Sequence, residues 1–134
     1  MVRFMRIAAV AIAVVLPTTA RAQAMGGMAG HAMPAGKDAT ISGTVVDVSC
    51  KFGQGLGGAE HKMCAEICAD RGLPLAILTD DGKLYIPASS GMPGDGQNAK
   101  LKPFAEQHVT VSGKVFAAGG AQAIQITNIA ARAR

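Results

Sequence analysis

Five segments with the character of β-strands follow one another along this chain, and their order limits the folds open to it. The first runs from Ala39 or Thr40 to Val48, is rich in β-branched residues and alternates in side-chain character. The turn sequences Asp80-Asp81-Gly82 and Gly119-Gly120 predict two antiparallel hairpins. The four strands of these hairpins are predicted at residues 75–79, 83–87, 108–116 and 121–129.

Two helical segments interrupt this series of strands. We expect the first from about Ala59 to Arg71, where Gly72 and Pro74 end it. A glycine-rich loop, residues 51–58, is expected to join it to the first strand. The second, residues 98–106, lies between the third and fourth strands and is expected to be interrupted around Pro103.

This order of elements resembles that of the OB-fold, a partly open Greek-key barrel of five strands. The resemblance is to small exported bacterial OB-fold proteins and covers about residues 40–129. It implies a mainly β fold, in which a five-stranded OB-like barrel has a Cys/His-bearing helical insert between strands 1 and 2 and a short helix between strands 3 and 4. An OB barrel usually has a hairpin turn where this insert lies. The insert is therefore expected at the barrel mouth, where OB proteins commonly bind ligands.

The first 22 residues have the parts of a secretory signal peptide. Arg3 and Arg6 precede an unbroken apolar run, residues 7–16, and Ala20-Arg21-Ala22 has the small residues of a cleavage site. The run is too short to span a bilayer, which takes about 20 residues. We therefore expect a cleaved signal over 1–22, a periplasmic protein, and no stable membrane insertion after cleavage. Cleavage after Ala24 is the alternative.

The remaining sequence divides by composition into an arm, a domain and a tail. Residues 23–38 are rich in glycine, methionine and alanine and are expected to form a flexible arm. Residues 39–130 are expected to form a single OB-like domain, and residues 131–134 a solvated tail.

The formal net charge of +4 comes mostly from the signal. Removing its three arginines from the 13 basic residues leaves 10 against 9 acidic residues, a net charge of +1. A charge this small, with few aromatic side chains for stacking, argues against nucleic acid as a partner.

One cluster of residues carries most of the chemical information, namely Cys50, His61, Cys64 and Cys68. An odd number of cysteines cannot all pair within one chain. At about 100° per residue, His61, Cys64 and Cys68 share one face of the predicted helix. Cys50, expected at the end of the first strand, can fold back onto that face through the glycine-rich loop. The four residues are predicted to form a Cys₃His metal site, with Zn(II) or Cu(I) as the ion.

Two other interpretations of the cluster remain open. A disulfide from Cys50 to Cys64 or Cys68 would attach the insert to the barrel, in a non-catalytic module that binds another periplasmic protein or a small ligand at the barrel mouth. A thiol redox protein is the third interpretation, although the usual Cys-x-x-Cys spacing is absent. No pair of carboxylates or nucleophile–base arrangement identifies a catalytic site, so the sequence favours no enzymatic activity.

Residues 64–68, Cys-Ala-Glu-Ile-Cys, resemble part of the dinuclear copper loop of cytochrome c oxidase subunit II. That family continues with a histidine four residues after the second cysteine and a methionine three residues later. Gly72 and Leu75 occupy these positions here, so two ligands are missing. The resemblance implies copper as the ion without implying a dinuclear site.

The predicted arm carries a second set of soft ligands: Met25, Met28, His31 and Met33. Thioether and imidazole groups bind Cu(I), whereas thioethers compete poorly for zinc. The arm is therefore a candidate secondary copper site, and the alternative is a linker that is methionine-rich by composition alone.

Overall fold

The long alternating segment forms β1 (Lys37–Asp47), the strand that closes the barrel. β1 pairs antiparallel with β4 (His108–Ala118) along its first part and with β2 (Leu75–Thr79) along its last part. The computed structural model describes residues 35–132. The predicted signal peptide and most of the predicted arm lie outside this range.

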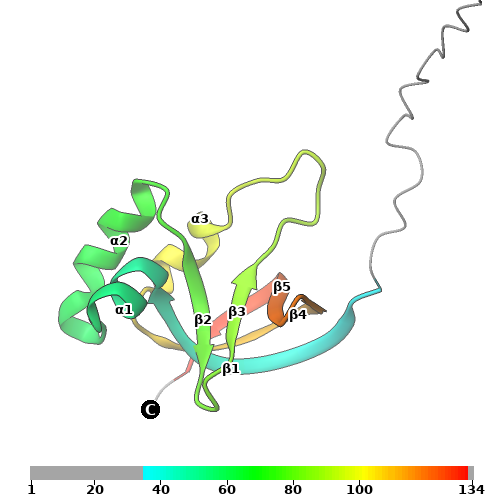
Figure 1. The fold of residues 1–134 in the computed structure, drawn as a ribbon, viewed down its shortest axis with the longest axis horizontal. Coiled ribbons are helices and arrows are strands. Elements are labelled where there is room, and N and C mark those ends of the chain that lie inside the picture. Colours follow the sequence, from blue (N-terminus) through cyan, green and yellow to red (C-terminus); the bar gives the residue numbers. More distant parts are fainter. Residues whose placement is uncertain (1–34, 133–134) are drawn as a thin grey trace, which may run out of the picture. The chain divides into compact units, whose positions relative to one another are not determined.

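Five strands close the barrel in the order β1-β2-β3-β5-β4 (Figure 1). β3 (Leu84–Pro87) and β5 (Ala121–Ala131) run parallel to each other, and the other neighbours are antiparallel. This order and the position of the helices confirm the predicted five-stranded OB-like barrel, with its helical insert between strands 1 and 2 and a short helix between strands 3 and 4.

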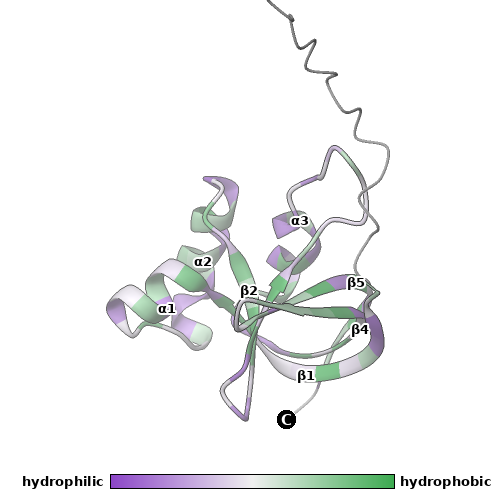
Figure 2. Cartoon of the chain, turned by 45° about the vertical axis from the view of Figure 1, so that its right-hand side comes forward, coloured by the Kyte–Doolittle hydropathy of each residue, from purple (hydrophilic) through white to green (hydrophobic). Residues whose placement is uncertain are grey.

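The insert consists of α1 (Val48–Gln54), a 3₁₀ turn η1 (Ala59–His61) and α2 (Lys62–Asp70). α1 and α2 lie side by side at one end of the barrel in both views (Figures 1 and 2). The second helical region is α3 (Asn98–Leu101), followed by the 3₁₀ turn η2 (Lys102–Phe104), so the predicted interruption around Pro103 is confirmed.

The expected strand end at Cys50, followed by a loop, is wrong, because Cys50 lies inside α1. The Asp47 side chain caps this helix by accepting a hydrogen bond from the Cys50 backbone N–H, at 3.1 Å. Gly55 ends the helix in the left-handed conformation, with φ of 70°. These two caps outweigh the strand propensity of Val48 and turn part of the glycine-rich segment into helix.

The core combines alternate strand residues with one side from each helical region. Figure 2 shows hydrophobic stretches along β2, β4 and β5. α2 contributes Ala69 and α3 contributes Leu101 to the same buried cluster. The strand members of the cluster are Val45, Leu75, Ile77, Val109, Val111 and Ile124. The helices are thus packed onto one end of the barrel rather than attached by loops alone.

Asn98 fixes the far end of α2 to the barrel. Its Nδ2 donates to the carbonyls of Ala69 and Leu73, at 3.1 and 2.8 Å, while its Oδ1 accepts from the Leu75 N–H at 3.1 Å. The side chain therefore binds one carbonyl near the end of α2, one carbonyl just after the helix, and the first N–H of β2.

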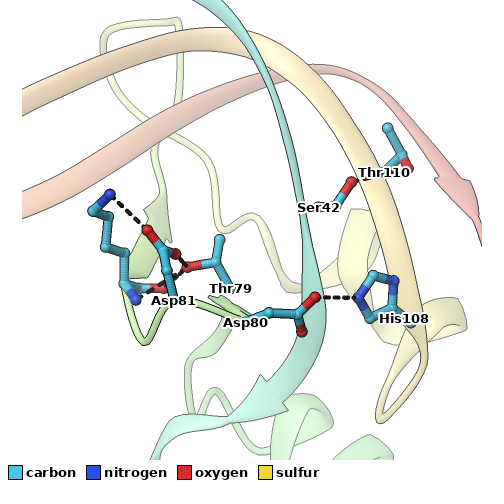
Figure 3. Close-up of polar contacts among 7 residues, drawn as sticks. Ser42, Thr79, Asp80, Asp81, His108 and Thr110 are labelled. Atoms are coloured by element: carbon cyan, nitrogen blue, oxygen red, sulfur yellow. Dashed lines mark hydrogen bonds and ion pairs between the residues drawn. The ribbon is translucent and has the colours of Figure 1, made fainter.

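Polar contacts stabilise the β2–β3 hairpin and join it to the start of β4 (Figure 3). The predicted turn at residues 80–82 is confirmed, and Lys83 and Thr79 both contact Asp81 within it. Asp80 approaches the His108 ring at 3.5 Å, at the start of β4. Among residues 35–132, no helix is long and apolar enough to cross a membrane.

Gly43 lies where two strand pairings overlap, because β1 pairs there with Thr79 of β2 and Val109 of β4 at once. A Cβ atom at Gly43 would lie 2.5 Å from the Leu78 carbonyl oxygen. We expect Gly43→Ala to lower the free energy of unfolding by about 1–3 kcal/mol, because two strands must move apart. Chemical denaturation measures this change.

Gly96→Ala is the matched control, since a Cβ atom there meets no atom within 4 Å. Equal stability of the Gly43→Ala and Gly96→Ala variants would contradict the tight packing of β1 against β2.

Candidate metal centre

Three thiols from two helices meet in the insert. Cys50 comes from α1, and Cys64 and Cys68 come from successive turns of α2, where residues four apart share a face. Their sulfur atoms all lie within 4.8 Å of one another. All three cysteines of the chain are in the described part, and none forms a disulfide.

This spacing suits a single metal ion. Sulfurs bound to one zinc ion at about 2.3 Å lie roughly 3.8 Å from one another. Closing the cluster from its present spacing to that distance takes a movement of about 1 Å or less. The three-cysteine cluster can therefore hold a metal ion. Cys50 is buried, Cys68 is half-buried and Cys64 is exposed, so the site opens to solvent on the Cys64 side.

Asp47 is a buried acidic residue beside this cluster and was not singled out from the sequence. Its side chain is 1% exposed, and none of the ion pairs within residues 35–132 includes it. Oδ1 accepts from the Cys50 N–H, whereas Oδ2 has no hydrogen bond of good geometry. Buried charges in proteins are normally paired or near a metal, so a cation at the cysteines would supply the missing countercharge.

The Asp47 carboxylate and the thiols affect each other's protonation. Burial alone would raise the pKa of Asp47, but interactions with the Cys50 N–H and with the Cys68 and Cys50 thiols hold that pKa below its usual range. Conversely, the adjacent Asp47 carboxylate and burial raise the pKa of Cys68 to about 12. Burial, followed by Asp47, raises the pKa of Cys50. A metal ion must therefore displace protons from these thiols as it binds.

His61, the fourth predicted ligand, is not in the group of mutually close ligand atoms. It lies in η1, immediately before α2, and its ring is 8% exposed. Nδ1 is 3.0 Å from Oε1 of Glu106, while Nε2 is buried without a hydrogen-bond partner among residues 35–132. The regular-helix angles used to place His61 beside the cysteines do not apply in a 3₁₀ turn, which has about 3.0 residues per turn.

Glu106 is the second buried acid that sequence reasoning missed. Its side chain is 2% exposed, and Oε2 accepts from the Gly58 N–H at 2.9 Å. It lies just after η2 with a positive φ of 59°, which is unusual for a residue other than glycine. No local pattern distinguishes Glu106 from a surface glutamate. Asp47 offered a usable signal, since an aspartate directly before the first helical residue is a common helix cap.

The secondary ligands proposed for the arm, Met25, Met28, His31 and Met33, lie outside the described residues. The structure therefore brings together three of the four principal candidates, and it places the fourth beside Glu106.

Comparisons of this chain with protein-family models, curated proteins and solved structures find no match.

The effect of Asp47 on the thiols can be tested by Asp47→Asn, which keeps a helix-capping side chain but removes the charge. We expect Cys68 to react with iodoacetamide at about pH 8 at least about tenfold faster in this variant, because each unit of pKa changes the thiolate fraction about tenfold. Peptide mass spectrometry after timed alkylation measures the rate at each cysteine.

Asp70→Asn is the control for this measurement, because Asp70 is an exposed residue at the end of the same helix. An unchanged Cys68 rate in Asp47→Asn, or an equal increase in Asp70→Asn, would show that Asp47 does not suppress the thiolate.

The raised pKa of Cys68 also predicts a pH dependence of stability in the metal-free protein. The unfolded thiol loses its proton near 9, whereas the folded thiol keeps it up to about 12. The folded state therefore binds more protons in this window, and the free energy of unfolding falls as the pH rises through it. Denaturation of wild type and Cys68→Ser between these pH values should show a steeper fall for wild type. Parallel curves would contradict the proposed protonation.

Proposed function

We propose that this protein is a periplasmic metal-binding protein that holds Cu(I) or Zn(II) through Cys50, Cys64 and Cys68, with His61 as the candidate fourth ligand. The observation that carries the proposal is the gathering of three unpaired sulfurs, from two separate helices, within 4.8 Å of one another. The buried and unpaired Asp47 carboxylate supports a cation at the same place.

Cu(I) is the ion that the three-sulfur arrangement favours. Thiolates are soft ligands that select Cu(I), and Cu(I) accepts fewer ligands than the four that structural zinc sites use. The resemblance of residues 64–68 to a copper loop and the methionines of the predicted arm favour the same ion. The site of the insert, on an OB-like barrel of the kind found in small exported proteins, fits a role outside the cytoplasm.

The exposure of the site supports a role in metal homeostasis or delivery. Cys64 is exposed, and its neighbours Met63 and Ile67 on α2 are 72% and 47% exposed. A partner protein can therefore reach one ligand directly and replace it while the buried Cys50 still holds the ion. Apolar side chains around an accessible ligand are suited to such a contact.

The metal content of the purified protein tests the proposal. The full chain is isolated from a periplasmic preparation without chelators, and its metal is measured by mass spectrometry together with its thiols. We expect about one copper or zinc ion per chain, and three thiols that react only after the metal is removed. A metal-free protein with one reactive thiol would contradict the proposal and would support the disulfide-linked binding module instead.

Substitution of the ligands gives the corresponding prediction. Replacing either Cys64 or Cys68 with serine is expected to abolish stoichiometric binding, because it removes one of only three thiolates and a serine hydroxyl is a poor ligand for a soft ion. Native mass spectrometry after metal loading measures the bound ion. Full retention of the ion by either variant would exclude these cysteines as ligands.

Two controls accompany the serine variants. Met63→Leu changes an exposed sulfur next to Cys64 and should leave the ion in place. Replacing Met25, Met28 and Met33 with leucine removes the thioethers of the predicted arm, and the ion at the cysteines should again be retained. Loss of that ion in the arm variant would place the principal site outside the cysteine cluster.

A further inference from the structure

A buried carboxylate–histidine pair lies at the start of the helix that carries two of the cysteines. The ring of His61 and the carboxylate of Glu106 are both more than nine-tenths buried. Glu106 uses both oxygens, one towards His61 Nδ1 and one towards the Gly58 N–H. The pair therefore joins the region before β4 to the turn that begins the metal-binding helix.

The hydrogen bonds of Glu106 determine which nitrogen of His61 carries the proton. A carboxylate only accepts hydrogen bonds, so Nδ1 must be the protonated nitrogen in the neutral ring. Nε2 then has a free lone pair, in a buried place where no described group donates to it. Histidines that bind metals commonly have this arrangement, with one nitrogen held by a carboxylate and the other available to the ion.

We propose that Glu106 is a positioning residue, which keeps His61 Nε2 available as a fourth ligand and thereby allows the three-cysteine cluster to accept Zn(II) as well as Cu(I). The inference depends on the proposed metal-binding function and adds a determinant of metal selectivity to it. Zn(II) needs four ligands and uses His61, whereas Cu(I) is held by the three sulfurs alone.

Recruitment of His61 requires a local movement, because Nε2 is not among the mutually close ligand atoms. His61 and α2 are adjacent in the chain, and the turn that holds His61 begins after the glycine-rich residues 57–58. The proposal requires this turn and the ring to move so that Nε2 reaches the sulfurs while Glu106 keeps its contact with Nδ1. Only the zinc form is expected to show that shift.

Glu106→Gln is the sharpest test of this role. The Gly58 N–H still needs an acceptor, so the glutamine oxygen turns to it and the amide NH₂ turns to His61. Nδ1 then accepts a hydrogen bond, which moves the ring proton to Nε2 and blocks the ligand. We expect the Zn(II) affinity to fall by about 10–100-fold. The Cu(I) affinity should remain within about threefold, because no sulfur ligand changes.

Competition titrations of the full chain with chelators of known affinity measure both constants. Co(II) replaces Zn(II) as a spectroscopic probe, because its absorption in the visible range changes with the number of sulfur and nitrogen ligands. The Co(II) spectra of Glu106→Gln and His61→Gln should change together. Glu66→Gln is the control, since Glu66 is a partly exposed carboxylate on α2 that pairs with Lys62.

The outcomes separate this inference from the metal site itself. No binding of either ion by wild type would overturn both proposals. Tight Zn(II) binding by wild type, with unchanged affinity and Co(II) spectrum in Glu106→Gln and His61→Gln, would leave the cysteine site intact and overturn the role of Glu106. Equal losses of Zn(II) and Cu(I) affinity would also overturn it, since they would indicate general damage to the site.

A measurement on wild type alone covers the case in which the variants do not fold. Nitrogen-15 NMR of the metal-free protein reports the tautomer of His61. A proton on Nδ1, together with a large shift of the Nε2 resonance on adding Zn(II) but not Cu(I), is the expected result. A proton on Nε2, or an Nε2 resonance unaffected by Zn(II), would overturn the inference.

Discussion

The buried carboxylate of Asp47 is the constraint on which the arrangement of the insert depends. It is the last residue of β1 and the cap of α1, so one side chain ends the strand and starts the helix. By accepting the Cys50 N–H it fixes the direction of α1, and with it the position of the buried thiol. The same carboxylate lies beside Cys68 of α2. Asp47 thus connects the end of β1 to cysteines on both helices of the insert.

The Asp47 carboxylate has two opposing effects on metal binding. A carboxylate buried next to thiols raises their pKa values and opposes the thiolate form that binds metal. The same negative charge attracts a cation, and a cation restores the thiolates by displacing their protons. A site of this kind keeps its cysteines protonated, and therefore less reactive, until an ion arrives. The presence of an acid at this position is thus compatible with metal binding and unfavourable for a redox-active thiol.

The fold could be predicted from the sequence because its signals are local. Alternating β-branched residues, two turn sequences and Pro103 located the strands and the broken helix to within a few residues. The meeting of Cys64 and Cys68 followed from helical spacing. The first helix was missed, because its caps at Asp47 and Gly55 override the propensity of the residues between them. The place of His61 was also out of reach, since it depends on Glu106, 45 residues away and in a backbone conformation that no sequence pattern indicates.

Two residues distant in the sequence hold α2 at its ends. Asn98 binds the Ala69 carbonyl of the helix and the Leu73 carbonyl just after it, and Glu106 binds the turn before its first residue. Both contacts come from the segment between β3 and β4, next to the short helix that packs in the core. The two cysteines of α2 are therefore held by the barrel, although the insert itself buries few apolar side chains. These contacts fix the two ends of the helix, while Cys64 between them stays exposed.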